Sequence, residues 1–402
     1  MAFAQKTEVL VVGAGPVGLL TAVMLAERGV DCWIIDRARR TNVRSYALAL
    51  HPQTLRMLDD IGLLEPVLKQ ANLLRRTSFY EGSTERLIID YDKLDVRHPY
   101  IAVLPQSALE AVLEERLRQK GIEVRWQHEL IELDLGSPDH ATATIHHTGD
   151  APQGYPVLDI QPMVLGRRTV KARYVIGADG YHSTVRKVLE IPRVPCGNKM
   201  YFSLYEFEST QDVGSEMRIV ASDGMLSVLW PLPGGWCRWA FGIANPGEHN
   251  SSLDQLRRLV GERAPWFSGL PLEIGWAACV RFEPYRLDTF GSGRVWLTGD
   301  AAHLSSPLGV HSMNVAFHEG HDLASRIFEI LRNSVPEDIL LAYSSSRRRE
   351  WQALLDPQQI EVGPAASSWT RVNAHRIVPS IPAAGRDLAA LLAQVGVTIR
   401  DL

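Results

Sequence analysis

Cysteine is scarce in this sequence. The 402 residues include four cysteines, which lie far apart and form neither a CxxC pair nor a Cys/His cluster: Cys32, Cys196, Cys237 and Cys279. This spacing argues against a disulfide framework and against a zinc site, so we expect no bound metal and a reducing, cytoplasmic location. The first residues, MAFAQKTEVLVVGAG, also lack the basic segment, apolar stretch and cleavage site of a secretory signal.

Long apolar runs and long basic runs are missing as well. No uninterrupted apolar stretch is long enough to cross a bilayer, so we expect no stable membrane insertion. The densest basic cluster is the short Arg347-Arg348-Arg349, and the formal net charge is −4, which argues against nucleic acid as a partner. The composition is 46% apolar, enough for a large core and for two or three domains. A small-molecule partner is therefore expected.

The N-terminal part of the chain alternates strand, turn and helix. Residues 8–36 read as the strand EVLVV, the turn GAGPVG, the helix LLTAVMLAERG and the strand VDCWIID, which together form a βαβ unit. The pattern predicts further helices over 51–70 and 106–121, and short strands over 77–82 and 86–92.

A β-rich stretch then interrupts this pattern. Between 199 and 245, apolar segments are separated by turn sequences such as Asp223-Gly224, which predicts a separate antiparallel sheet. The α/β pattern returns near Arg294 and continues into a helix from about 313 to 332. We therefore predict an α/β fold of three parts: a nucleotide-binding domain of residues 1–75, 100–180 and 286–345, a β-rich domain of residues 76–99 and 181–285, and a helical segment over 346–402.

Three glycines mark the turn between the first strand and the first helix. In the pattern Gly13-x-Gly15-x-x-Gly18, the first glycine allows a tight turn, the second lets a pyrophosphate approach the backbone, and the third lets the helix pack on the strand. Asp36, at the end of the next strand, can accept hydrogen bonds from a ribose. This motif indicates a dinucleotide site but does not separate NAD from FAD, and a glycine-rich turn without a ligand is the alternative interpretation.

Two later motifs resolve this choice through a family resemblance. They are YVIGADGYHSTVRKVL, residues 174–189, and GDAAHLSSPLGVHSMN, residues 299–314. With the glycine motif, they make residues 8 to about 350 similar to the p-hydroxybenzoate hydroxylase family of single-component FAD-dependent aromatic monooxygenases. The resemblance implies a Rossmann-like FAD-binding domain, an antiparallel β-sheet substrate domain and C-terminal helices.

The resemblance also implies which residues contact FAD. It implies that Gly13, Gly15 and Gly18 hold the pyrophosphate and that Asp36 binds the adenosine ribose. Arg44 and Gln106 would contact the phosphates and the ribityl chain, and Asp300 would bind a ribityl hydroxyl. Asp179 and Gly180 would contact both FAD and the nicotinamide nucleotide. From the residues alone, other interpretations stay open. Arg44 can be a surface arginine, Gln106 an ordinary first residue of a helix, and Asp300 a helix N-cap.

The loop after Asp300 would hold the flavin ring. The ring would lie beside Pro307 and Gly309, and the helix that begins at Met313 and Asn314 would direct free N–H groups at its N1 and C2 carbonyl. Where the family commonly has Gly-Gln-Gly, this chain has Val310-His311-Ser312. Ser312 is a candidate helix cap. Pro307 and His311 are the candidate catalytic residues, with a solvent-facing His311 as the alternative.

The reaction implied by the resemblance is hydroxylation of a phenolic or polycyclic aromatic substrate. NADH or NADPH reduces the flavin, O2 forms a C4a-hydroperoxide, and the aromatic carbon attacks its distal oxygen. Aromatic and basic side chains of the β-rich domain are candidate substrate contacts, or core residues: Tyr201, Tyr205, Arg218, Trp230 and Arg238. Other flavin redox chemistry (epoxidation, Baeyer–Villiger insertion, an oxidase or a dehydrogenase) and a non-catalytic FAD- or metabolite-binding protein remain alternatives. The last segment could support a homodimer.

Overall fold

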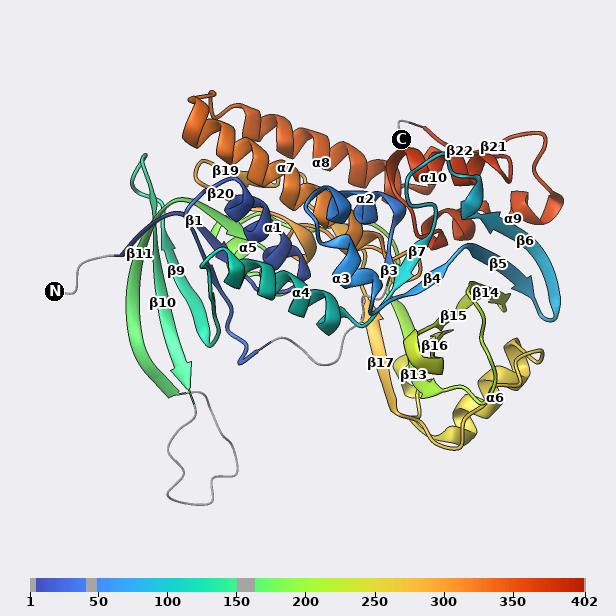
Figure 1. The fold of residues 1–402 in the computed structure, drawn as a ribbon. Coiled ribbons are helices and arrows are strands. Elements are labelled where there is room, and N and C mark those ends of the chain that lie inside the picture. Colours follow the sequence, from blue (N-terminus) through green and yellow to red (C-terminus); the bar gives the residue numbers. More distant parts are fainter. Residues whose placement is uncertain (1–4, 41–48, 150–162, 401–402) are drawn as a thin grey trace, which may run out of the picture.

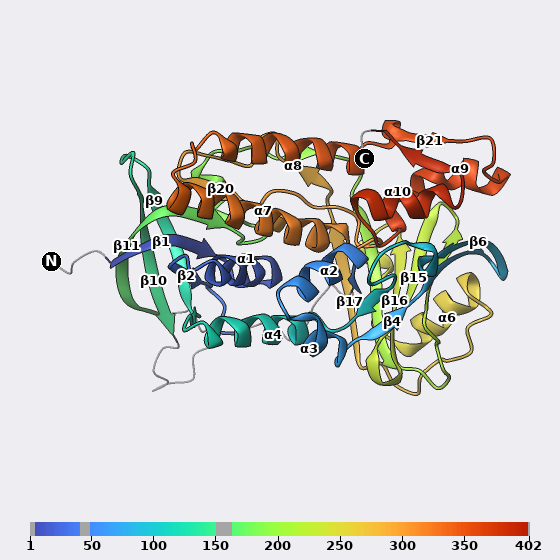
Figure 2. The same ribbon diagram turned by 45° about the horizontal axis from the view of Figure 1, so that its top comes forward.

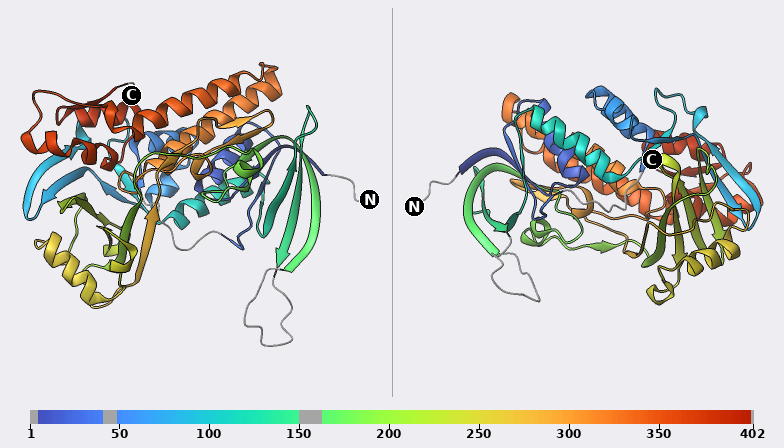
Figure 3. Two further views of the ribbon diagram at one scale, coloured as in Figure 1. Left: turned by 180° about the vertical axis from the view of Figure 1, so that it is seen from behind. Right: turned by 60° about the horizontal axis from the view of Figure 1, so that its bottom comes forward.

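The computed structural model describes residues 5–40, 49–149 and 163–400 (Figure 1). Arg44, one of the expected FAD contacts, lies outside these residues. Two large sheets organise the chain, one at the N-terminal side and one beside helix α6, and the C-terminal elements lie next to the second sheet (Figures 1 and 3).

The predicted βαβ unit forms the centre of the first sheet. Strand β1 (Gln5–Val12) is followed by helix α1 (Pro16–Glu27) and strand β2 (Cys32–Ile35), and β1 pairs in parallel with β2 and with the end of β11 (Met163–Gly177). Residues 9–12 of β1 are an apolar, buried run, which is typical of a parallel strand covered on both faces. The sheet order is β19-β20-β11-β1-β2-β8, with the short strands β8 (Val124–Arg125), β19 (Gly291–Ser292) and β20 (Val295–Leu297).

Long helices cover this sheet. Helix α1 packs between α4 (Gln106–Gln119) and α7 (His311–Asn333), and α8 (Ile339–Leu355) runs beside α7 (Figure 2). The single helix expected over 51–70 is two helices, α2 (Pro52–Asp60) and α3 (Leu64–Leu68). They are separated where Gly62 adopts a left-handed φ of +67°, a conformation that ends a helix.

A three-stranded antiparallel extension was not predicted from the sequence. It is formed by β9 (His128–Asp134), β10 (Ala141–Gly149) and the first part of β11, and it projects from the first sheet (Figure 1). Its strands carry the exposed apolar residues Ile131, Val164 and Leu165.

The second sheet contains the β-rich region. Its strand order is β17-β13-β16-β15-β14-β5-β6. The strands are β17 (Trp276–Phe282), β13 (Met200–Glu208), β16 (Trp236–Ile243), β15 (Met225–Pro231), β14 (Glu216–Ser222), β5 (Arg76–Glu81) and β6 (Thr84–Asp90). The strands expected near 77–92 thus join the later β-rich region. The antiparallel sheet expected between 199 and 245 is confirmed by the pairs β13–β16, β16–β15 and β15–β14, and the earlier strand β5 joins it by pairing in parallel with β14. One face packs against α6 (Leu253–Arg263), and the other joins the core of the first sheet.

Short elements connect these layers. A small sheet joins β3 (Ala49–Leu50), β7 (Ile101–Val103) and β4 (Asn72–Leu74), the strands β12 (Val194–Pro195) and β18 (Tyr285–Arg286) pair with each other, and α5 (Thr184–Val188) follows β11. The C-terminal segment holds α9 (Ser368–Ile377) and α10 (Gly385–Ala393). It is not helical throughout, because β21 (Ile360–Val362) pairs with β22 (Val397–Ile399). None of the helices in the described ranges is long and apolar enough to span a membrane.

Candidate functional site

The glycine turn has the geometry that its motif requires. Gly13 has a φ of +106°, and a Cβ added there would lie 2.3 Å from the Ala178 carbonyl oxygen. A Cβ on Gly18 would lie 1.9 Å from the Gly13 oxygen, so helix α1 could not pack so closely with any larger residue. A Cβ on Gly15 would meet no atom within 4 Å, which leaves open space at the N-terminus of α1. This end of α1 can therefore accept a phosphate group.

Asp36 lies beside this turn, as expected. Its carboxylate accepts hydrogen bonds from the backbone N–H groups of Ala14 and Ala38, each at 2.7 Å. Asp36 also lines a cavity of about 270 Å³, called here the outer cavity, together with Gly13, Asp179 and Thr184. The outer cavity is thus lined by both the glycine turn and carboxylate side chains.

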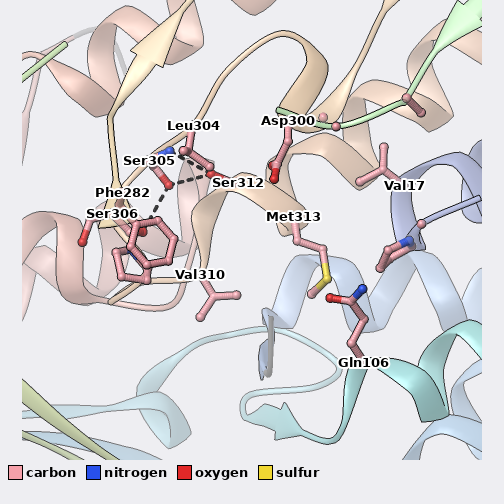
Figure 4. A pocket seen from close by; sticks show the side chains of 16 residues that line it. Val17, Gln106, Phe282, Asp300, Leu304, Ser305, Ser306, Val310, Ser312 and Met313 are labelled. Atoms are coloured by element: carbon pink, nitrogen blue, oxygen red, sulfur yellow. Dashed lines mark hydrogen bonds between the residues drawn. The ribbon is translucent and has the colours of Figure 1, made fainter. Parts of the chain in front are cut away.

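An inner cavity of about 320 Å³ lies next to the outer one, and Figure 4 shows the side chains that line the inner cavity. Gly15, Ala178 and Gly180 line both cavities, so the two form one elongated space along the glycine turn. Further along, the inner cavity is lined by Gln106, Phe282, Asp300, Ser305, Pro307, Val310, Ser312 and Met313, among others.

Asp300 faces the inner cavity from a short 3₁₀ turn, Gly299–Ala301, that follows β20 (Figure 4). The N-cap of this turn is Thr298, so the interpretation of Asp300 as a helix cap is wrong. The Asp300 side chain is exposed in the cavity, and the protein around the carboxyl group desolvates it and so raises its pKa.

Glu319, on α7, holds the turn that carries Asp300. Its carboxylate accepts hydrogen bonds from the Thr298 hydroxyl (3.1 Å), the Gly299 N–H (3.2 Å), the His303 ring (2.8 Å) and the Trp351 indole (2.7 Å). Burial alone would raise the pKa of Glu319, but the charge and hydrogen bond of His303 lower it below its usual value. Sequence reasoning missed this buried pair, although His303 lies inside the motif that contains Asp300.

Gly180 lines both cavities, and Asp179 beside it lines the outer one. One Asp179 oxygen, Oδ2, accepts hydrogen bonds from the N–H groups of Thr184 (2.7 Å) and Val185 (3.1 Å). The other, Oδ1, is buried without a hydrogen-bond partner in the described chain. Burial raises the pKa of this carboxyl group. An unpaired buried oxygen at the cavity wall is the feature expected where a polar ligand normally binds.

Gln106 also lines the inner cavity, at the start of α4. Its side-chain amide donates a hydrogen bond to Glu110 at 2.7 Å. Glu110 is buried, and this desolvation raises its pKa to about 7. Gln106 is therefore held in place by a second residue that the sequence did not single out.

The start of α7 differs from the sequence expectation. The helix begins at His311, two residues earlier than expected, and Val310 is its N-cap. Ser312 does not cap the helix: its hydroxyl accepts a hydrogen bond from the Ser305 N–H and contacts the Ser305 hydroxyl, both at 2.9 Å. Met313 lines the inner cavity. In such a helix the free N–H groups are those of residues 310–313, so Ser312 and Met313 supply donors and Asn314 does not.

Asn314, His311 and Gly309 do not line the cavity. The buried Asn314 side chain donates to the Ala49 carbonyl (2.9 Å) and accepts from the His51 N–H (2.8 Å). His311 is also buried and donates from Nε2 to the Ile381 carbonyl (2.7 Å). The solvent-facing interpretation of His311 is therefore wrong, and its side chain lines neither the inner cavity nor the cavity beside the second sheet, so the geometry does not support a catalytic role. A Cβ on Gly309 would lie 2.7 Å from the Pro379 oxygen, so this glycine permits close packing of the C-terminal segment.

A third, small cavity of about 30 Å³ lies on the side of the second sheet and is called here the sheet-side cavity. It is lined by Leu204, Val228, Trp230, Arg238, Ala240, Phe282, Pro307, Leu308 and Val310. Trp230 and Arg238 therefore line a cavity, and their contact with a substrate stays a prediction. Arg238 is buried and forms an ion pair with Glu206.

Tyr201, Tyr205 and Arg218 lie on the opposite face of the second sheet. Tyr205 belongs to the cluster that packs under α6, and the Arg218 guanidinium lies 5.4 Å from the centre of the Trp266 ring. Tyr201 shares the face of Tyr205, because side chains two residues apart on a strand point the same way. The expectation that these three residues line the substrate wall is corrected, since apolar residues occupy both faces and the sequence alone could not distinguish them.

Comparisons with known proteins agree with this geometry. A family model described as an FAD binding domain matches residues 6–358. The 6-methylpretetramide 4-monooxygenase of Streptomyces rimosus is 28% identical over 86% of this chain and 59% of its own length. The para-nitrophenol 4-monooxygenase of Pseudomonas sp. (strain WBC-3) is 28% identical over 87% of this chain and 84% of its own.

A solved structure shows the same fold. The crystal structure of p-nitrophenol 4-monooxygenase from Pseudomonas putida DLL-E4 matches with a TM-score of 0.77, at 24% identity and with 97% of both chains covered. By contrast, this chain spans about three fifths of the length of the Streptomyces rimosus relative. The match over residues 6–358, together with the glycine turn and the two joined cavities, shows that the chain belongs to the FAD binding domain family and that its cofactor is FAD.

Proposed function

We propose that this protein is a monooxygenase that uses FAD, NADH or NADPH, and O2 to hydroxylate a phenolic substrate. The observation that supports this proposal most strongly is the meeting of two cavities. Phe282, Pro307 and Val310 line both the inner cavity and the sheet-side cavity. A substrate ring at this meeting point would lie between the second sheet and the end of the FAD space.

The residues along the elongated space fit FAD. The glycine turn and the N-terminus of α1 would hold the pyrophosphate, and Asp300 would accept a hydrogen bond from a ribityl hydroxyl. The unpaired Asp179 oxygen provides a further acceptor at the wall. When bound, FAD supplies the transfer of electrons to O2 and of one oxygen atom to the substrate.

The chain would support that chemistry in three ways. The N–H groups of Ser312 and Met313, at the N-terminus of α7, favour negative charge at this end of the inner cavity. Apolar residues such as Phe282 and Leu204 exclude water from the substrate side. Arg238, held by Glu206, is the charged side chain of the sheet-side cavity and would orient an anionic substrate oxygen.

The test uses the purified protein loaded with FAD. Oxidation of NADH and of NADPH is measured with and without single-ring and polycyclic phenols, under ¹⁸O2, and products are identified by mass. Stimulated oxidation with one ¹⁸O atom in the product supports the proposal. Reduction with release of H2O2 and no oxygenated product would favour an oxidase or dehydrogenase. No reduction with any phenol would favour a binding protein.

The proposal extends to location and assembly. The four cysteines are unpaired, which is compatible with the reducing cytoplasm that the sequence predicts. We also propose a homodimer, which size-exclusion chromatography with light scattering can measure. A monomeric mass would contradict it.

A further inference from the structure

Val310 has an unusual backbone conformation for its residue type. Its φ of +51° and ψ of +35° lie in the left-handed region. There a Cβ clashes with the neighbouring backbone, and a β-branched side chain is a genuine outlier. The other described non-glycine residues with positive φ are Gln127, Glu190, Asp223 and Ser334, and none of them is β-branched.

Hydrogen bonds on both sides hold Val310 in this conformation. The His51 ring bonds to the Gly309 carbonyl (2.8 Å), and the Asn314 amide donates to the Val310 carbonyl (2.8 Å). The bond from His311 to Ile381 fixes the next residue (2.7 Å). All of these bonds involve the backbone of residues 309 and 310 or a neighbouring side chain, so a glycine at 310 would keep them and relieve the strain.

The isopropyl group of Val310 therefore affects the shape of the cavities that it lines, and not the hydrogen bonds of the loop. Val310 is 8% exposed and lines both the inner cavity and the sheet-side cavity (Figure 4). With Phe282 and Pro307 it forms a wall between the two cavities, called here the partition. The sheet-side cavity, at about 30 Å³, is far smaller than the roughly 150 Å³ in which a benzene ring binds. A substrate ring that enters from the inner cavity towards the second sheet has to pass the partition, where each carbon of the protein side chains reduces the room for the ring.

We propose that Val310 determines substrate size: its side chain admits a single phenolic ring and excludes fused rings. This inference rests on the proposed function, because it takes the ring site to lie at the partition. Val310 acts by filling space beside the ring and takes no part in proton or electron transfer. The strained backbone is kept because it directs a branched side chain to this point, where glycine would leave a gap.

The experiment compares three variants with the unaltered protein, all loaded with FAD. Val310→Gly removes the side chain and the strain, and Val310→Ala removes most of the side chain but keeps a Cβ at positive φ. Ser334→Gly is the matched control, because Ser334 has the same conformation (φ +54°) at the far end of α7. Binding of phenol, 1-naphthol and 1-anthrol is measured from changes in the visible flavin spectrum, and Tm is measured by thermal unfolding.

Val310→Gly should tighten binding of 1-naphthol about tenfold relative to phenol, since a few carbons in an apolar pocket change selectivity by this amount. Val310→Ala should shift this ratio less, and Ser334→Gly should leave it unchanged. Val310→Gly should also have a higher Tm than Val310→Ala, because both lose the buried side chain but only alanine keeps the strain.

An unchanged ratio in Val310→Gly, or no binding of any phenol to any of the proteins, would overturn the inference. A changed ratio with no oxygenated product would support the size selection by Val310 and contradict only the proposed function. The two failures can therefore be told apart.

Discussion

At the scale of single residues, Asp300 combines access to the inner cavity with a lack of competing partners. Among the described residues, none donates a hydrogen bond to its carboxylate. We therefore expect Asp300→Ala to weaken FAD binding about 10- to 100-fold, because a hydrogen bond to a charged group contributes about 1.5–3 kcal/mol. FAD titration of the apoprotein measures the change. Asp254→Ala, at an exposed position on α6, is the control. FAD affinity equal to that of the unaltered protein would contradict the role of Asp300.

Ser312 closes its loop through Ser305. Ser312→Gly would place a glycine where the family commonly has one. The structure predicts a loss of about 1–2 kcal/mol in the free energy of unfolding, because the hydroxyl makes two hydrogen bonds to Ser305. Urea unfolding of Ser305→Ala, Ser312→Gly and the double variant measures the coupling. A coupling energy near zero would show that this contact does not stabilise the loop.

Residues whose role depends on the local backbone were predictable from the sequence. Gly13 and Gly18 lie where a strand meets a helix, and the turn between these elements requires them. Tyr201 and Val310 were not predictable, for different reasons. Apolar residues on both faces of the second sheet hide which way Tyr201 points. The conformation of Val310 is held by Asn314 within the same helix and, on either side of Val310, by contacts of His51 and of the C-terminal segment, and these last two lie far away in the sequence.

At the scale of elements, the start of α7 depends on buried neutral histidines. Burial lowers the pKa of His51, His311 and His318, and that of His318 falls to about 3. In the unfolded chain these rings take up protons near pH 6.5, whereas in the folded protein they do not. Stability from these groups is therefore complete above about pH 6.5 and is lost as the pH falls towards the folded pKa values.

This linkage predicts a specific effect of His311→Gln. The amide can still donate to the Ile381 carbonyl, but one titrating group is removed. When the pH falls from 7 to 5, the free energy of unfolding of His311→Gln should decrease less than that of the unaltered protein, by up to about 1.4 kcal/mol per pH unit. Urea unfolding at pH 7, 6 and 5 with saturating FAD measures this slope, and the exposed His375→Gln is the control. A slope equal to that of the unaltered protein would contradict the prediction.

The elements themselves were predictable where one periodicity dominates. The buried run of β1 and the amphipathic α4 follow from the sequence. The extension of β9, β10 and β11 did not, because its strands leave apolar residues such as Val164 exposed and lack a clear alternation. The parallel pairing of β5 with β14 could not be predicted either, since the two strands lie about 140 residues apart and the sequence of a strand does not indicate which strand it pairs with.

At the scale of the whole molecule, the C-terminal segment joins the two sheet systems. Ile381 accepts the hydrogen bond from His311 at the start of α7, and Gln394 exchanges two hydrogen bonds with the backbone of Asp90 at the end of β6. Asp387 of α10 forms an ion pair with Arg56 of α2 at 2.9 Å. The segment therefore holds the second sheet against the helices beside the inner cavity. A shift of this segment would change how the inner cavity meets the sheet-side cavity.

The ion pair of Asp387 and Arg56 can be used to test how firmly the C-terminal segment is attached to the helices. The Asp387 side chain is 7% exposed and that of Arg56 is 29% exposed, and Arg56 Nη1 is already buried without a partner. Asp387→Ala would leave the guanidinium largely buried and uncompensated, so we expect the free energy of unfolding to fall by about 2 kcal/mol, less than for a fully buried pair. Glu262→Ala removes the exposed pair with Arg258 on α6 and should cost no more than about 1 kcal/mol. Equal losses in the two variants would mean that the ion pair contributes no more than a surface contact. The remaining contacts of Ile381 and Gln394 would then have to hold the C-terminal segment in place.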